Sequence, residues 1–394
     1  MIGQVRVFIT PVKQYTRGSG MVYADEFEAT EWLANSGNSI ITQGVDISKT
    51  EIGAYYFGEM SLSFINIGGE FNNPYPIADS RSFFPWRGRD QAKVRIDYEL
   101  DGVSKTVFRG LVADEVTSLN VTGNKIKIRV TSLDSVLRKA PVSGGVVANG
   151  ILISDAIKNI LSRPYVTTVL NYDAANITVP NDITVDDVSF LFTKTAKEAL
   201  DLLLLAGAAV LFTDSTGNVI VKGRDANDNT PHALYGDYDL LERSNIISVE
   251  ARSGLAETYN QLVIGESTYK DDGLIFEQGL RKKELTNLDK LFSSLEARER
   301  IMQTLVSVFS KPKETLELET QYKTAESFQL FDAVTVDFGQ RFENLNTAYY
   351  DVGVYDEAVY PKASNGRIIN GLYKILGIEH NIERQSTVLQ LKEV

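Results

Sequence analysis

The stretch FRGLVADEVTSLNVTGNKIKIRVTSLDSVLRKAPV, residues 108–142, indicates the kind of fold that this chain adopts. Residues Lys125–Thr131 alternate basic with apolar side chains, so a strand here has one charged and one apolar face. Gly123 and Asn124 supply a turn before this strand. A short helical step follows and stops at Pro141. The pattern predicts two antiparallel strands joined by a turn.

The two faces of the second strand predict different surroundings. We expect the apolar side chains, Ile126, Ile128 and Val130, to pack in the core of a barrel. The basic face, carried by Lys125, Lys127 and Arg129, is free to meet solvent or a neighbouring subunit. The strand is expected to leave the barrel at Asp134, and Ser135–Ala140 to lead into the next part of the chain.

The residues before this stretch have the same pattern. Val94–Leu100 alternates apolar with polar residues, and Asp101-Gly102 follows directly, which is a strong signal for a two-residue hairpin turn. The partner strand is predicted over Val103–Leu111. Strands this close, joined by tight turns, favour an antiparallel sheet or barrel.

The middle of the chain changes to a helical period. Ser154–Leu161 predicts a helix that ends near Arg163, because Pro164 follows. A second helix begins at Thr195, where Glu198 three residues later completes a capping box, and it is predicted to stop at Gly207. Strands at 209–212 and 219–221 complete a small α/β unit.

The last third is again mostly strand, at 316–320, 334–338 and 388–391. One long helix is predicted near 290–310, with an inward face formed by Leu291, Leu295, Arg298, Met302, Leu305 and Phe309. No internal sequence repeat is visible. Candidate boundaries at Ser143–Gly150 and Gly223–Gly236 divide the chain into a first β-barrel domain (1–145), an inserted α/β domain (146–235) and a second barrel domain (236–394).

Composition narrows the possible functions. The chain has 394 residues, a formal net charge of −12 and no cysteine, which excludes disulfides and cysteine-based metal sites. A protein that grips nucleic acid normally carries a basic surplus, so we expect no specific DNA binding. The opening residues predict a strand rather than a signal peptide, and the longest apolar run, Leu202–Phe212, is too short to cross a membrane.

The sequence predicts no catalytic residue, no metal site and no cofactor. His232 and His380 are the only histidines, and neither lies in a metal-ligand spacing, so we expect surface or half-buried imidazoles. Hydrolysis by a pair of carboxylates is not excluded, because carboxylates are abundant. However, 52 acidic residues form pairs by chance, and no cluster stands out. Glycine-rich phosphate loops and the serine-nucleophile motif are also absent from the sequence.

One polar loop partly resembles a calcium-binding loop. Asp225, Asn227 and Asn229 match its first ligand positions, but Thr230 replaces the turn glycine and Gly236 replaces the final glutamate. A polar connecting loop is the favoured interpretation of Asp225–Asn229, with a weak cation site as the alternative. The aromatic window at 83–87, FFPWR, fits a loop that packs on the barrel and a partner contact equally well.

The order of these segments resembles the hub proteins of phage tail baseplates and tail tips. The resemblance covers nearly the whole chain and is carried by these segments: Gly58–Asn66, Gly69–Phe71, Phe108–Gly110 with the hairpin up to Asp134, Ile153–Leu161, Thr195–Arg224, Ile246–Gly265, Phe331–Val336 and Tyr373–Leu391.

The resemblance implies a fold and a function. Hubs of this family are homotrimers in which each chain supplies two similar antiparallel β-barrel domains, with a small α/β domain inserted between them. The trimer forms a pseudo-sixfold ring that joins the sixfold tail tube, or the distal tail protein, to a threefold central spike or fibre. Passing DNA and the tape-measure protein occupy its channel. The implied location is the virion, after assembly in the host cytoplasm, without membrane insertion.

Two other functions remain open at this point. The chain could be a distal tail ring or a receptor-binding tail protein, which would have one barrel domain rather than two. It could also be a tail hydrolase for glycans or peptides, against which the missing cysteine and the scarcity of histidine weigh. A bare hub without an enzymatic extension is the favoured interpretation.

Overall fold

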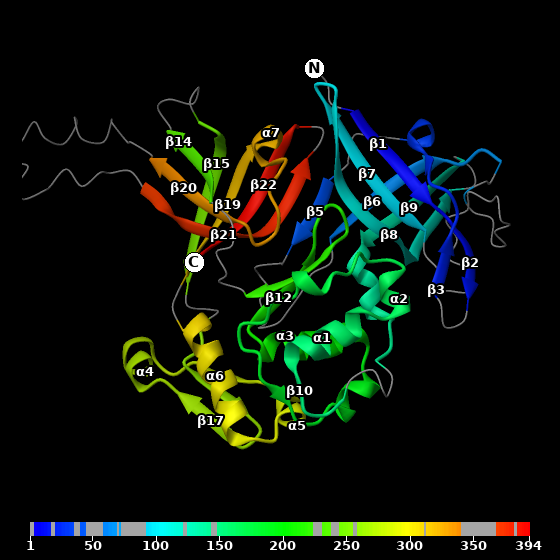
Figure 1. Ribbon diagram of the computed structural model, residues 1–394. Helices are drawn as coiled ribbons and strands as arrows, with labels where there is room; N and C mark the ends of the chain where they lie inside the picture. The colour runs from blue at the N-terminus through cyan, green and yellow to red at the C-terminus, as the bar shows by residue number, and fades with distance from the viewer. Residues whose placement is uncertain are drawn as a thin grey trace, which may run out of the picture.

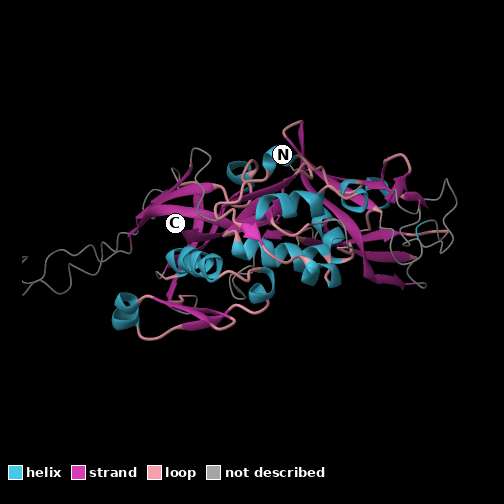
Figure 2. Cartoon of the chain, turned by 60° about the horizontal axis from the view of Figure 1, so that its bottom comes forward, coloured by secondary structure: helices cyan, strands magenta, loops and turns pink. Residues whose placement is uncertain are grey.

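The computed structural model describes residues 4–16, 20–34, 40–44, 58–68, 71, 92–120, 124–142, 148–223, 231–237, 244–254, 258–310, 313–339, 368–381 and 384–394. Two curved sheet regions lie side by side, and a mixed helical and β region lies below both of them (Figure 1). Most of the helices lie near the middle of the molecule, with strands on several sides of them (Figure 2). The chain is therefore β-rich, as the sequence predicts.

The two curved regions are halves of one sheet. Among the described residues, thirteen strands pair in the order β15-β19-β22-β21-β5-β6-β9-β8-β7-β1-β4, with β20 and β14 branching from β21. We call one side the first half-barrel: β1 (Gln4–Thr10), β4 (Phe27–Glu28), β5 (Ile40–Gly44), β6 (Glu59–Ile65), β7 (Lys93–Leu100), β8 (Val103–Asn120) and β9 (Lys125–Ser132). The second half-barrel contains β14 (His232–Asp237), β15 (Ile246–Gly254), β19 (Lys313–Gln321), β20 (Ala333–Gly339), β21 (Ile368–Asn381) and β22 (Ser386–Glu393).

Two features of the sheet differ from the prediction of two antiparallel barrels. The half-barrels share one sheet, because β21 pairs with β5. In addition, β14 pairs with β20 in parallel, whereas the other pairs of the thirteen-stranded sheet are antiparallel. A chain segment of nearly one hundred residues separates these two parallel strands, which is long enough for a crossover connection.

The opening stretch folds as predicted. Strands β8 and β9 pair in antiparallel fashion, and Ile126, Ile128 and Val130 are fully buried in the first half-barrel core. The strand then runs into a 3-10 helix at Leu133–Arg138, where Asp134 is buried. The hairpin before it is also confirmed, because Asp101 and Gly102 join β7 to β8 with positive φ at both residues.

The α/β region contains α1 (Ile153–Leu161), α2 (Pro164–Thr167), α3 (Ala196–Ala206) and the hairpin of β12 (Ala209–Thr213) with β13 (Val219–Gly223). The capping box between Thr195 and Glu198 is confirmed at the start of α3. Helix α3 ends at Gly207, but the positive φ belongs to Ala208. Gly207 is instead confined by packing, since a Cβ there would lie 2.5 Å from Val179 Cγ1.

The helix predicted near 290–310 is present as α6 (Leu295–Phe309), but its start differs from the prediction, because Leu291 belongs to a separate short helix. Leu288–Leu291 forms this short helix, α5, and α6 begins after the N-cap residue Ser294. Leu295 is 60% exposed, so it does not belong to the inward face. The buried face of α6 is formed by Ile301, Met302, Leu305, Val306 and Phe309.

The described residues form three hydrophobic cores. One lies in each half-barrel, and the third joins α1, α3 and α6. Hairpin β12–β13 contributes to two of them, because Leu211 faces the helical core while Phe212 packs against Phe331 of the second half-barrel. Within the described residues, no helix is both long and apolar enough to cross a membrane.

Candidate assembly surface

The strand order of the first half-barrel recurs in the second. The order β5-β6-β9-β8-β7 corresponds to β15-β19-β22-β21-β20, and within each series every neighbouring pair is antiparallel. The two series are therefore two copies of one arrangement, although the sequence has no visible repeat. Strands β8 and β21 occupy equivalent places, as do β5 and β15.

The turns confirm this equivalence residue by residue. Asn120 pairs with Lys125 across the β8–β9 turn, and Asn381 pairs with Ser386 across the β21–β22 turn, so both turns have four residues. The last residue of each turn, Asn124 or Gln385, has positive φ without being glycine.

A backbone hydrogen bond is also conserved between the two turns. The carbonyl of Asn124 accepts a bond of 2.6 Å from Asn66 N, and the carbonyl of Gln385 accepts one of 2.8 Å from Tyr322 N. Because Asn66 directly follows β6 and Tyr322 directly follows β19, these strands are equivalent as well. The residues of the two half-barrels can therefore be matched one by one along these strands.

The long strand β21 makes the contact between the half-barrels. Its first part, residues 368–374, pairs with β20, and its last part, residues 377–381, turns to β5, where Glu379 lies opposite Thr42. The equivalent strand β8 also pairs with β7 through its first part only, up to Leu111. Its last part, residues 117–120, pairs with β9 on one edge.

Several strand edges are open in the described part of the chain, including those of β4 and β14, and two others are equivalent to edges that pair within the chain. No described strand pairs with the second edge of β8 at residues 117–120, and none pairs with the second edge of β15 along residues 248–254. By equivalence, the open edge of β8 corresponds to the edge of β21 that pairs with β5. The open edge of β15 corresponds to the edge of β5 that pairs with β21. Unpaired edges of this kind are templates for pairing with another chain.

The exposed face of the joined sheet has an acidic and a basic side. On the second half-barrel, exposed Glu250 and Glu317 lie directly opposite each other, and like charges in this position are unfavourable. Burial, with a further contribution from Glu317, raises the pKa of Glu379. On the first half-barrel, Lys125 and Lys127 are exposed on β9, as the sequence predicts.

Arg129 differs from its neighbours on β9, because it forms an ion pair with Glu59 of β6. Both side chains remain more than 40% exposed, so this ion pair contributes little to stability. Of the three basic residues singled out on this strand, Arg129 is paired with a carboxylate, whereas Lys125 and Lys127 are exposed and have no ion-pair partner among the described residues.

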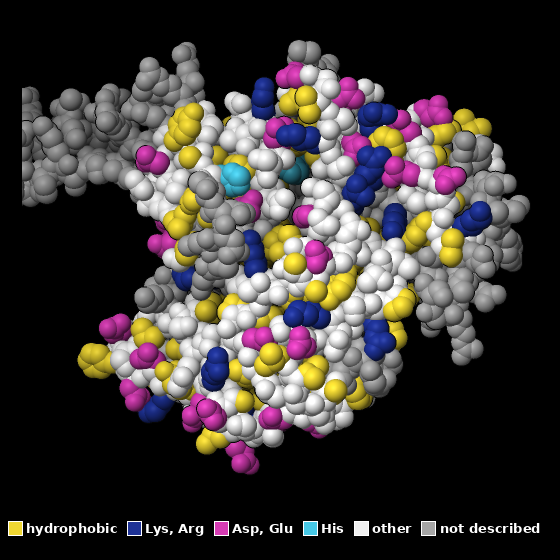
Figure 3. Space-filling model, viewed as in Figure 1, with side chains coloured by type: hydrophobic (Ala, Val, Ile, Leu, Met, Phe, Trp, Pro, Cys, Tyr) yellow, Lys and Arg dark blue, Asp and Glu magenta, His cyan; other side chains and the backbone are white. Residues whose placement is uncertain are grey.

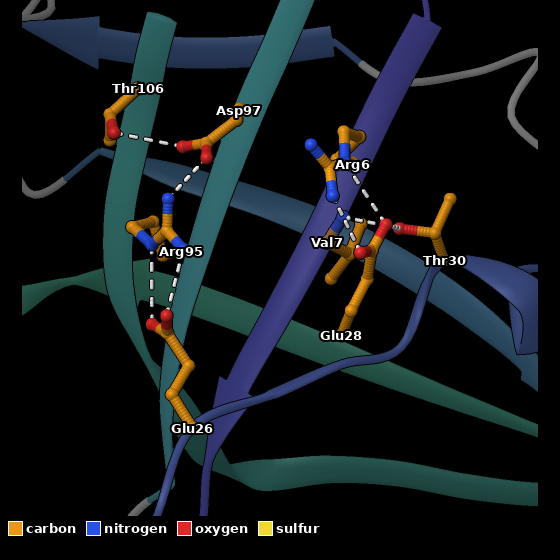
Figure 4. Close-up of polar contacts among 8 residues, drawn as sticks. All are labelled: Arg6, Val7, Glu26, Glu28, Thr30, Arg95, Asp97 and Thr106. Carbon is orange, nitrogen blue, oxygen red and sulfur yellow. Dashed lines mark hydrogen bonds and ion pairs between the residues drawn. The ribbon is translucent and has the colours of Figure 1, made fainter. Parts of the chain in front are cut away.

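A second charged surface, on β1 and β7, carries two separate groups of polar contacts (Figure 4). Arg6 donates two hydrogen bonds to Glu28, of 2.7 and 3.1 Å, and Arg95 donates two to Glu26, of 2.7 and 3.2 Å. Arg95 also pairs with Asp97. The Arg6 guanidinium lowers the pKa of Glu28. Charges of both signs are interspersed over this face (Figure 3), so it is not a continuous basic patch.

The two half-barrels are also locked together by α7 (Tyr322–Ala325), which follows β19. Tyr322 is buried in the first half-barrel core, with its ring centroid 4.7 Å from that of Tyr98 and 5.2 Å from that of His380. At the rim of this contact, Lys105 pairs with Glu326 at 2.6 Å. An aromatic plug with a charged rim therefore fixes the relative position of the two halves.

The histidines do not form a catalytic arrangement. His232 is half-buried, as predicted. It lies beside Asp332, with 3.2 Å between Nε2 and Oδ2. His380 is more buried than predicted, at 7% exposure, and its Nδ1 lies 2.9 Å from Thr387 Oγ1. Among the described residues, no group of three or more potential metal ligands occurs. Asp225–Asn229 and the aromatic window at 83–87 lie outside the described residues.

Comparison with solved structures identifies the fold. The tail protein from Neisseria meningitidis MC58 aligns with a TM-score of 0.58 and 14% identity, over 100% of this chain and 97% of that one. The 43 kDa tail protein of prophage MuSo2 from Shewanella oneidensis aligns with a TM-score of 0.53 and 13% identity, over 98% of both chains. Prophage tail protein gp18 from Listeria monocytogenes EGD-e aligns with a TM-score of 0.51 and 10% identity, over 98% of this chain and 94% of that one.

These alignments extend over essentially whole chains, so the chain has the fold of phage tail proteins. No family model and no curated protein matches the sequence.

Proposed function

We propose that this chain is a structural component of a bacteriophage tail tip or baseplate, in which three copies form a hub ring of pseudo-sixfold symmetry. The ring joins the sixfold tail tube to a threefold central spike or fibre. It encloses the channel for DNA and the tape-measure protein, and it assembles in the host cytoplasm before it enters the virion. The shared fold of three tail proteins supports the tail assignment.

The repeated strand order carries the ring proposal. Within one chain, the end of β21 pairs with β5 and joins two half-barrels. The same arrangement has one open edge at the end of β8 and another at β15. If β8 of one copy pairs with β15 of the next, every junction in the ring uses the same contact, and three chains place six half-barrels around one axis.

The alignment of the half-barrels predicts the register of this junction. Counted from the two turns, Ser118 is equivalent to Glu379, and Thr42 of β5 is equivalent to Arg252 of β15. Because Glu379 lies opposite Thr42 within the chain, Ser118 of one copy should lie opposite Arg252 of the next. The exposed sheet face then turns toward the channel, where its carboxylates repel DNA.

The oligomeric state and symmetry test the proposal. Light scattering should give three times the 43.7 kDa mass of one chain, and micrographs should show a threefold ring with a central opening. A monomer at micromolar concentration that also shows no ring in micrographs would contradict it.

Two other functions remain as alternatives. A distal tail ring or a receptor-binding tail protein would use a single barrel per chain, and the two half-barrels support the hub instead. We propose no catalytic activity. A clear lysis zone in a zymogram on cell-wall material would contradict that part of the proposal.

A further inference from the structure

Two neighbouring cations lie where the first half-barrel meets the α/β region. Lys93 is the first residue of β7, and Arg109 lies on the adjacent strand β8, opposite Arg95. Lys93 and Arg109 therefore occupy diagonal positions on the same face of the sheet. Both side chains are half-buried, so each keeps some contact with solvent.

Lys93 is held in place by neutral groups. Its Nζ donates a hydrogen bond of 2.8 Å to the carbonyl of Thr168, just after α2, and lies 4.3 Å from the centroid of the Tyr23 ring. Burial, followed by repulsion from Arg109, lowers the pKa of Lys93 to about 8. Within the described residues, no carboxylate offsets these two effects.

Arg109 has no acidic partner among the described residues either. Its Nε is buried and has no hydrogen-bond partner among the described residues. The directly opposed Arg95 is different, since Glu26 and Asp97 both bind it. A buried guanidinium N–H without an acceptor is unfavourable, and a second cation beside it adds to this penalty.

We propose that Lys93 and Arg109 form a binding site for a carboxylate, supplied by an acidic side chain of another protein chain. One carboxylate can accept a hydrogen bond from the guanidinium and another from the ammonium group, so it neutralises both cations. A protein side chain fits better than DNA, because a phosphate backbone requires an exposed row of cations and this chain carries a net charge of −12.

The site itself does not depend on the ring. Only the expectation that the acidic chain is another tail component rests on the proposed function, so the test uses the isolated chain.

Nuclear magnetic resonance of ¹³C-methylated lysines tests the site with acetate as the carboxylate probe. The Lys93 signal is assigned with the variant Lys93→Arg. Replacing chloride with acetate at constant ionic strength should shift this signal saturably and raise the pKa of Lys93 above its starting value of about 8. Arg109→Gln should weaken the acetate response at least about tenfold, as expected when one of two charged donors is lost.

Lys127 provides the matched control, because it is an exposed lysine of the same half-barrel, and its signal should not respond. If Arg109→Gln does not fold, Arg109→Lys keeps the charge and should give a weaker acetate response than the wild type. The proposal is wrong if acetate causes no saturable shift, or if the shift is the same in a folded Arg109 variant. A response to inorganic phosphate but not to acetate would overturn the carboxylate assignment.

Discussion

Two buried ionisable side chains, Asp134 and His380, lie at junctions of the molecule. Asp134 is located where β9 passes into the α/β region, and His380 is in the part of β21 that contacts β5. Burial raises the pKa of Asp134 to about 8 and lowers that of His380 to about 4. Each shift favours the neutral form, and the two have opposite effects on stability as pH changes.

Asp134→Asn should flatten the pH dependence of stability between pH 4 and pH 8. The pKa of Asp134 is about 8 in the folded chain and about 3.8 when unfolded, so its contribution is complete below pH 4 and is lost as pH rises toward 8. Asparagine stays neutral, and the variant should be more stable than the wild type at pH 8 by at least about 1 kcal/mol. Urea unfolding at pH 5 and pH 8 measures this difference.

The exposed residue Asp155 of α1 supplies the control for Asp134, because Asp155→Asn makes the same change of formal charge. Equal pH profiles for Asp134→Asn and the wild type would show that Asp134 is ionised in the folded chain near neutral pH.

His380→Gln should flatten the pH dependence of stability between pH 4 and pH 6.5. The pKa of His380 is about 4 when folded and about 6.5 when unfolded, so its contribution is complete above pH 6.5 and is lost as pH falls toward 4. Glutamine takes up no proton, and the variant should lose less stability over this interval than the wild type, by about 1 kcal/mol or more. Thermal unfolding at pH 4.5 and pH 7 measures the loss, and equal losses would count against a buried neutral imidazole.

At the scale of elements, Gly110 of β8 leaves no room for a side chain against β9. A Cβ at this position would lie 2.4 Å from the carbonyl oxygen of Thr131. Gly110→Ala should therefore destabilise the chain by about 1–3 kcal/mol, as measured by urea unfolding. Gly273 lies in α4 (Asp272–Gln278) without positive φ, and a Cβ there would make only an ordinary contact of 3.4 Å with Asp271 Oδ1, so Gly273→Ala is the control that should be tolerated. Unchanged stability of Gly110→Ala would mean that the two strands are farther apart.

Alternation and turn residues were sufficient to predict most elements. The hairpin at Asp101-Gly102 and the capping box at Thr195 are local signals, and both are confirmed. The break between α5 and α6 was missed, because Leu291 and Leu295 continue the helical period although Ser294 caps a new helix. The helical spacing of apolar residues alone does not show where an N-cap residue starts a new helix.

At the scale of the whole molecule, the pairing of β21 with β5 and the open edges could not be predicted from the sequence. Strand pairing over more than three hundred residues depends on the folded arrangement, and the two half-barrels share strand order rather than residue identities. The only local signals were the four-residue turns after Asn120 and Asn381. The equal length of these two turns is therefore the one feature of the sequence that points to the repeated strand order.

Charge reversal at Lys127 tests which surface makes the contact between copies. Lys127 lies on the exposed face of β9, directly opposite Ser118, so its side chain is on the sheet face while β8 lies between it and the open edge. Lys127→Glu should change the free energy of unfolding by less than about 0.5 kcal/mol and should leave the ring intact. Light scattering and unfolding of the same sample measure both effects. A folded variant that stays monomeric would mean that the face, rather than the edges, is the interface.

Cross-linking through engineered cysteines tests the central claim most directly, because the chain has no cysteine of its own. In the variant Ser118→Cys with Arg252→Cys, the two thiols should face each other across the junction between copies, and oxidation should give a closed covalent trimer on a non-reducing gel. Leu119→Cys with Arg252→Cys is one residue out of register and should cross-link poorly. Equal cross-linking of both pairs, or only monomer from the first pair, would contradict the proposed ring.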